Sequence, residues 1–160
     1  MNGFEISRNI EIGVHKLPEV FKGLENVEFL KKVFGGEEEL KRVLQDLCVR
    51  ITKRHGYMWV DDENCQICIS FDYLSGADER YIYLDMVHEL IHIKQLKDGR
   101  ELFDKKYIYV ERPTEVEAYK ITVEEAKRIG MKENEIIYYL SVEWINQEDR
   151  VKLLKALGLI

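Results

Sequence analysis

Residues 85–97 read Asp-Met-Val-His-Glu-Leu-Ile-His-Ile-Lys-Gln-Leu-Lys. Apolar side chains flank the two histidines, and this pattern predicts a buried helix. His88 and His92 are four residues apart, so on a helix they share one face and can direct two imidazole nitrogens at one point in space. The motif His-Glu-x-x-His therefore predicts two ligands of a metal ion.

A metal ion held by two neutral nitrogen ligands needs a third protein ligand, and a catalytic ion also keeps one position for water. A helix predicted to begin at Pro113 carries two carboxylates in its first turns, Glu115 and Glu117. They are two residues apart and cannot both face the ion, so the spacing leaves the third ligand open between them. Glu89 lies beside His88 but off the ligand face, which makes it the candidate general base for a metal-activated water.

Residues 88–92, followed by Glu-x-Glu-Ala-Tyr at residues 115–119, resemble the gluzincin metallopeptidases, and among them the compact single-domain members. The resemblance covers about residues 81–130. It implies a Zn²⁺ ion held by His88, His92 and a helical glutamate, with Glu89 as base, in a cleft between a small sheet and the active-site helix. A small residue commonly follows the glutamate ligand in that family. The resemblance therefore favours Glu117, which precedes an alanine, over Glu115.

The chain departs from the thermolysin-like members of this family at one point. Those relatives place an aspartate four residues after the glutamate ligand, where it braces a histidine. This chain has Ile121 four residues after Glu117, and Tyr119 four residues after Glu115. We therefore expect the outer hydrogen-bond partner of a histidine to come from elsewhere, and Asp85, one turn before His88, is the candidate.

A peptidase also needs a donor for the negative oxygen that develops on the scissile carbonyl. Tyr107, Tyr109 and Tyr119 are candidates because they are near the expected ligands in sequence. Substrate is expected to lie extended along an edge strand of the sheet, formed by residues 65–71 or 81–84. The sequence thus predicts a zinc-dependent metallopeptidase that hydrolyses peptide bonds in a peptide or protein substrate.

Two other functions stay open. The same site would support a metal-dependent hydrolase acting on a non-peptide amide or ester. A catalytically silent member could instead keep the scaffold as a binding or regulatory module. In that case its own C-terminal helices could lie across the cleft as an autoinhibitory cover.

The order of the predicted elements indicates one α+β domain over residues 1–160 with a small antiparallel sheet. The resemblance implies that this sheet packs on the active-site helix in a zincin-like arrangement. Alternation of apolar residues and enrichment in aromatic and β-branched residues predict strands at residues 10–14, 57–60, 65–71 and 81–84. Helical periodicity, caps and stops predict helices at residues 26–34, 37–52, 85–97, 113–129, 133–145 and 148–157.

The composition limits the partners. The 160 residues carry a net charge of -6, which provides no positive field for a phosphate backbone or an anionic membrane, so neither nucleic acid nor a membrane is expected. No targeting or membrane-spanning segment is recognised, which predicts a cytoplasmic protein.

The chain has three cysteines, Cys48, Cys65 and Cys68. They are interpreted mainly as small buried apolar residues. A second metal site completed by His55, or a disulfide from Cys48, is the alternative.

Overall fold

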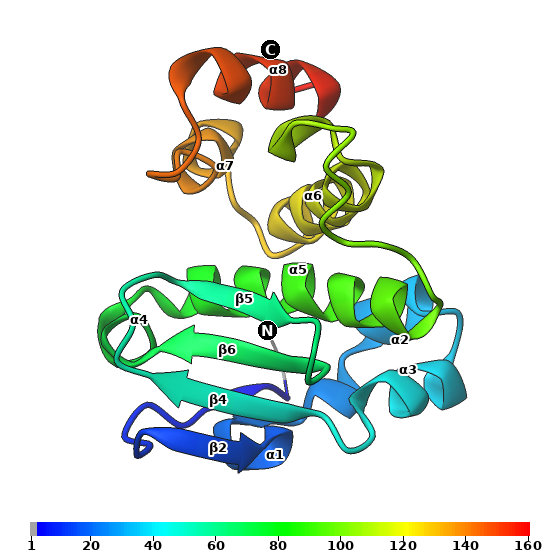
Figure 1. Ribbon diagram of the computed structural model, residues 1–160, viewed down its shortest axis with the longest axis vertical. Helices are drawn as coiled ribbons and strands as arrows, with labels where there is room; N and C mark the ends of the chain where they lie inside the picture. The colour runs from blue at the N-terminus through cyan, green and yellow to red at the C-terminus, as the bar shows by residue number, and fades with distance from the viewer. Residues whose placement is uncertain (1–2) are drawn as a thin grey trace.

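The computed structural model describes residues 3–160 and has a mixed α+β fold, as predicted. One long helix, α5 (Glu79–Lys97), crosses the molecule between a mixed β-sheet and a group of C-terminal helices (Figure 1). The sheet packs on α5 through strand β5 (Met58–Asp61), and helix α6 (Pro113–Arg128) packs on α5 from the other part of the molecule. The His-Glu-x-x-His motif therefore lies at the centre of the fold.

The main sheet has four strands in the order β2-β4-β6-β5. Their bounds are Gly13–Lys16, Cys48–Thr52, Gln66–Ser70 and Met58–Asp61, respectively. The sheet is antiparallel except between β4 and β6, which run parallel with Val49 opposite Ile67. Because β5 occupies one edge, its outer backbone groups are not paired within the sheet.

The N-terminal part supports the sheet and one end of α5. Strands β1 and β3 form a separate antiparallel pair, and helix α3 contacts α5. The elements are β1 (Glu5–Ile6), α1 (Leu17–Val20), β3 (Phe21–Lys22), the short 3-10 helix η1 (Leu24–Asn26), α2 (Glu28–Val33), α3 (Glu37–Leu44) and, after β6, α4 (Phe71–Gly76).

Helix α5 begins where the Asp78 side chain accepts a hydrogen bond from the Arg80 backbone N–H, which satisfies one of the unpaired donors of the first turn. Most side chains of α5 are buried, because the sheet covers one face of the helix and α6 covers the other. A helix that is apolar around its circumference is typical of a protein core. The two histidines are therefore held on a rigid element.

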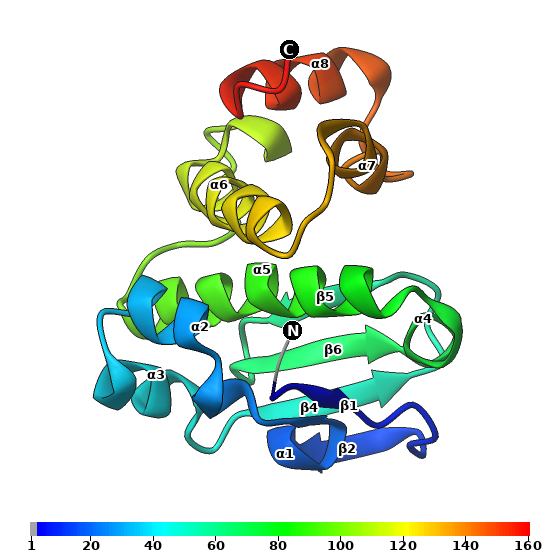
Figure 2. The same ribbon diagram turned by 180° about the vertical axis from the view of Figure 1, so that it is seen from behind.

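The C-terminal elements lie together on the far side of α5 from the sheet (Figure 2). They are η2 (Tyr109–Glu111), α6 (Pro113–Arg128), α7 (Glu133–Tyr139) and α8 (Gln147–Ala156). Pro113 occupies the first turn of α6, and Gly130 follows that helix with φ +92°, a left-handed conformation that suits glycine at a helix end. These boundaries agree with the predicted helices, except that α7 ends earlier than residue 145.

Two predicted elements are wrong. The helix predicted at residues 37–52 ends at Leu44, because Asp46 adopts a left-handed φ of +58° and β4 follows. The strand predicted at residues 81–84 is the first part of α5, where a run of fully buried apolar residues suits either structure. The first predicted strand, residues 10–14, is displaced to β2, whereas β5 and β6 appear where they were expected. Within residues 3–160, no helix is both long and apolar enough to cross a bilayer.

Candidate metal centre

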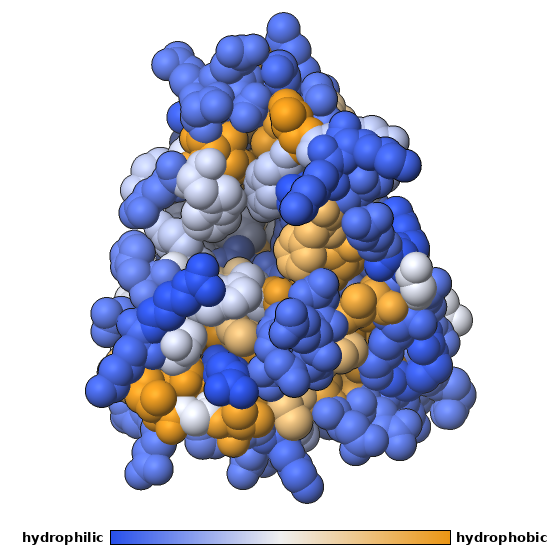
Figure 3. All heavy atoms as spheres, viewed as in Figure 1, coloured by the Kyte–Doolittle hydropathy of each residue, from blue (hydrophilic) through white to orange (hydrophobic). Residues whose placement is uncertain are grey.

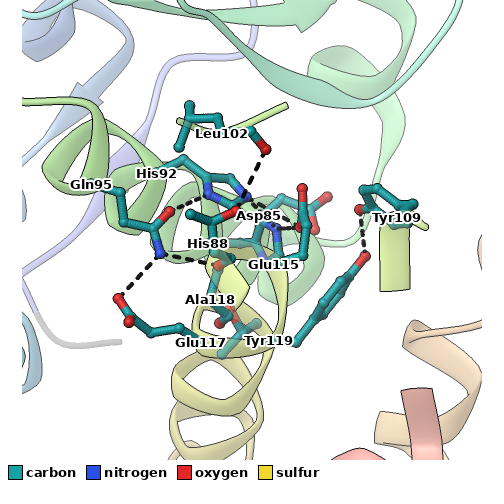
Figure 4. A network of polar contacts seen from close by, with 12 residues as sticks. Asp85, His88, His92, Gln95, Leu102, Tyr109, Glu115, Glu117, Ala118 and Tyr119 are labelled. Carbon is teal, nitrogen blue, oxygen red and sulfur yellow. Dashed lines mark hydrogen bonds and ion pairs between the residues drawn. The ribbon is translucent and has the colours of Figure 1, made fainter. Parts of the chain in front are cut away.

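Three buried side chains from α5 and α6 converge on one point. His88 and His92 come from α5 and Glu115 from the first turn of α6 (Figure 4). The two Nε2 atoms are 3.1 Å apart, and Oε2 of Glu115 lies 3.1 Å from Nε2 of His88 and 3.3 Å from Nε2 of His92. The three side chains are each more than nine-tenths buried. This group could hold a metal ion.

The spacing of the three atoms fits one small divalent ion. Bonds of roughly 2.0–2.2 Å to nitrogen and oxygen place neighbouring ligands of a tetrahedral zinc ion about 3.3 Å apart. The three separations, 3.1, 3.1 and 3.3 Å, are close to that value. Two imidazole nitrogens and a carboxylate oxygen leave the fourth tetrahedral position to be filled from the cavity.

Gln95 fixes the orientation of the His92 ring through the Nδ1 atom. Nδ1 of His92 lies 2.8 Å from Oε1 of Gln95, an oxygen that can only accept, so Nδ1 carries a proton and Nε2, which faces Glu115, is the nitrogen that can bind a metal ion. Gln95 in turn donates to the Thr114 carbonyl and to Glu117. The sequence reasoning missed Gln95, although its place three residues after His92 on one helix would have indicated the contact.

Glu117, which the resemblance favoured as the third ligand, does not join the histidines. Its carboxylate accepts hydrogen bonds from Gln95 at 3.1 Å and from Arg100 at 2.9 Å, and its side chain is 45% exposed. The correction is a consequence of helix geometry. Residues two apart on α6 point to nearly opposite sides, and packing on α5 turns Glu115 inward.

The electrostatics of the three groups are strongly coupled. Burial alone would raise the pKa of Glu115, but hydrogen bonds and charge interactions with His88 and His92 lower it well below its usual range. Burial would lower the pKa of His92, whereas the Glu115 carboxylate opposes it and the pKa rises to about 9. Without a metal ion, a proton on His92 and a negative charge on Glu115 therefore hold this site together.

Glu89, the predicted general base, lies close to the candidate ligands. It is 8% exposed and lines the same cavity as His88 and His92. Burial raises the pKa of the Glu89 carboxyl well above that of an exposed glutamate; His92 opposes this rise, and the nearby Glu115 and Asp85 carboxylates add to it. A raised pKa brings a carboxylate closer to the range in which it can both take up and release a proton near neutral pH.

Asp85 does not have the predicted role of bracing a histidine. Its two carboxylate oxygens accept hydrogen bonds from the hydroxyl groups of Tyr73 and Tyr139 instead. Burial raises the pKa of Asp85, and the two tyrosine hydroxyls oppose that rise. The residue that braces a histidine is Gln95.

Two of the three candidate tyrosines face the site. Tyr109 and Tyr119 line the cavity and their hydroxyl oxygens are 2.9 Å apart, while the Tyr119 ring centre lies 4.5 Å from that of His88. Burial raises the pKa of both hydroxyls, so each keeps its proton near neutral pH and can donate it. Tyr107 is 43% exposed and does not line the cavity.

A cavity of about 450 Å³ opens beside the three candidate ligands. Figure 3 shows this face of the molecule hollowed between the sheet and the C-terminal helices. Met58, Trp59 and Val60 of β5 form one wall, and the end of α7 with residues 140–142 and Trp144 forms the opposite wall. The edge strand beside the site is therefore β5. The predicted strand at residues 65–71 is the inner strand β6, and residues 81–84 are helical.

The remaining histidines and the cysteines lie elsewhere. His15 hydrogen-bonds the Glu11 carbonyl, and His55 is largely exposed at the surface near Glu143. All three cysteines are free, and only Cys68 is fully buried. No second cluster of ligand side chains forms within the described residues, so neither the disulfide nor the second metal site is formed.

Comparisons of the chain with protein-family models, with curated proteins and with solved structures found no match. The chemistry of the site is therefore the basis for a function.

Proposed function

We propose that this protein is a zinc-dependent metallopeptidase of the gluzincin type. The observation that carries the proposal is the convergence of His88, His92 and Glu115 on one point, with the Glu89 carboxyl in the same cavity. Two histidines and one glutamate with a free fourth position are a ligand set of catalytic zinc sites. When bound, zinc would polarise the scissile carbonyl and lower the pKa of a water at the fourth position.

Glu89 is the proton carrier in this proposal. It takes a proton from the attacking water and delivers it to the nitrogen of the leaving amine, so that one side chain serves first as base and then as acid. Its raised pKa supports the second step, since a carboxyl with a very low pKa would retain a transferred proton poorly.

Tyr119 and Tyr109 are proposed to stabilise the transition state. A hydroxyl that stays protonated and faces the cavity can donate a hydrogen bond to the oxygen that gains negative charge. Tyr119 is the stronger candidate, because its ring packs against His88. Tyr109 would then orient the Tyr119 hydroxyl through their 2.9 Å contact.

The substrate is proposed to bind as an extended peptide along β5. This strand is a sheet edge, and three of its residues line the cavity. Its outer N–H and C=O groups could pair with a peptide backbone. The other wall narrows the approach, because Trp144 packs on Tyr57 with ring centres 5.2 Å apart and the Tyr57 hydroxyl donates to Glu143. The C-terminal segment thus restricts access to the cavity, and this favours short or unfolded peptides over folded proteins.

The direct test is cleavage of a mixed peptide library by the zinc-loaded protein and by Glu89→Gln. Glu89→Gln preserves size, so we expect zinc to be retained and peptide cleavage to fall by roughly three orders of magnitude or more. A matched control is Glu124→Gln, an exposed glutamate on α6, which should cleave like the wild type. Equal cleavage by wild type and Glu89→Gln would remove Glu89 from this role. Ester or non-peptide amide cleavage without peptide cleavage would identify a different hydrolase.

A further inference from the structure

Asp85 is the acidic group of the cavity that the proposed reaction does not use. It lies on α5 one turn before His88 and lines the same cavity as the candidate ligands. Three residues of an α-helix advance about 4.5 Å along its axis. A ligand group held by Asp85 would therefore lie next to the position of the reacting bond.

The Asp85 carboxylate has hydrogen-bond donors but no lysine or arginine partner. Tyr139 donates to one oxygen at 2.5 Å and Tyr73 donates to the other. Among the described residues no lysine or arginine forms an ion pair with it, and His88 is the one basic side chain that stabilises its charge. An ionised carboxylate has about four acceptor positions, so two hydroxyl donors leave room for a further partner. A charge removed from water without a counter-charge is costly, which favours the entry of a cation.

Aromatic rings surround this end of the cavity. The rings pack on one another, with centres 5.1 Å apart for Tyr57 and Tyr73 and 5.3 Å apart for Tyr81 and Tyr139. The lining aromatic side chains linked to Asp85 by these ring contacts and by hydrogen bonds are Tyr57, Tyr73, Tyr81, Tyr139 and Trp144. Faces of tyrosine and tryptophan rings attract ammonium and guanidinium groups.

The charged residues that line the cavity also favour a bound cation. Its charged lining consists of Asp85, Glu89 and Glu115 with the two histidines, and neither lysine nor arginine is among the described lining residues. A divalent ion would balance the charges of Glu115 and Glu89. The charge of Asp85 is then the surplus, and it makes this end of the loaded site negative.

We propose that the Asp85 end of the cavity is a subsite for a positively charged group, an ammonium or a guanidinium, that adjoins the scissile bond of the substrate. That the bound cation adjoins a scissile bond rests on the function proposed above. That the Asp85 end of the cavity binds a cation does not depend on that function. The cation could be the free amino terminus of a peptide or the side chain of a lysine or arginine. Both have the same recognition chemistry and differ in where along the peptide the charge lies.

A purely structural role for Asp85 makes a different prediction. Its two hydrogen bonds tie α4, through Tyr73, and α7, through Tyr139, to α5. If this were its only role, Asp85→Asn would weaken binding of charged and neutral ligands by the same factor. A subsite for a cation predicts that the ratio of the two affinities changes.

The experiment measures peptide binding by calorimetry to the zinc-loaded Glu89→Gln protein, with and without Asp85→Asn. One pair of blocked pentapeptides has lysine or its uncharged isostere norleucine at the central position. The other pair, made of alanine, has a free or an acetylated amino terminus. Asp72→Asn is the matched control, because it removes the negative charge of an exposed aspartate on α4, beside Tyr73, that does not line the cavity.

We expect one charged peptide to bind roughly tenfold or more tightly than its neutral partner, a preference expected of a charge-assisted contact. Asp85→Asn should abolish that preference, and Asp72→Asn should keep it. The pair that shows the preference identifies the source of the cation. Equal binding within both pairs, or a preference that survives Asp85→Asn, would overturn the proposal. Asp85-dependent binding without cleavage by the Glu89-containing protein would sustain the subsite and reject the peptidase function.

Discussion

Oε1 of Gln95 lies 2.8 Å from Nδ1 of His92 and sets which nitrogen of that ring is free to bind a metal ion. The contact is made within α5, and Gln95 is itself held by the Thr114 carbonyl and by Glu117 on α6. The two helices that carry the candidate ligands are thus also joined by a second set of contacts. Such outer contacts strengthen metal binding by fixing the direction of the ligand.

Gln95→Ala should therefore weaken zinc binding by roughly 10- to 100-fold, because His92 loses its orienting acceptor. The measurement is competition with a chelator of known affinity. Gln147→Ala is the control, since that exposed glutamine lies on α8 away from the site. An unchanged affinity in Gln95→Ala would show that packing alone orients His92.

Glu115→Ala and Glu117→Ala form a matched pair on α6. Removal of Glu115 takes away one of the three converging atoms, so we expect nearly complete loss of zinc at micromolar concentrations. Removal of Glu117 breaks contacts to Arg100 and Gln95 and should leave zinc bound at close to one ion per chain. The reverse order of zinc retention would restore Glu117 as the ligand.

Zinc binding should release about one proton per ion near pH 7.5. In the metal-free protein the pKa of His92 is about 9, above its ordinary value of 6.5, so this ring holds a proton at that pH. A ligand nitrogen must be unprotonated, and the affinity should therefore increase as the pH rises, up to about 9. Calorimetry in buffers of different ionisation enthalpy measures the released proton. A binding enthalpy that is independent of the buffer would contradict the coupling.

Tyr119→Phe should lower kcat by roughly two orders of magnitude with zinc still bound, which is the usual effect of losing one donor to the developing oxyanion. Tyr109→Phe should have a smaller effect, because it acts through Tyr119. Tyr107→Phe is the control outside the cavity. If Tyr109→Phe were the more damaging change, the two tyrosines would exchange roles.

Much of the site could be read from the sequence because its signals are local. The spacing of His88 and His92 defines a helix face, and Pro113 marks the start of the helix that carries Glu115. The choice between the two glutamates depends on how α6 is rotated against α5. A signal for that rotation was present, because Glu115 shares its helical stripe with the buried residues Ala118 and Thr122, whereas Glu117 does not.

Other features depend on contacts that no local pattern records. Leu40, Val43, Leu47 and Ile51 suit a helix, yet Val49 and Ile51 also alternate with exposed Arg50, and pairing with β2 and β6 selects the strand. The tyrosines that bind Asp85 come from residues 12 and 54 positions away along the chain. Long-range packing determines both the strand β4 and the hydrogen-bond partners of Asp85.

The central claim is tested most directly by the zinc content of the wild-type protein and of His92→Ala, both purified without chelators and measured by elemental analysis. The account predicts about one zinc ion per wild-type chain and almost none in His92→Ala, with both proteins folded by circular dichroism. A wild-type protein without zinc, or a His92→Ala variant that retains a full equivalent, would contradict it.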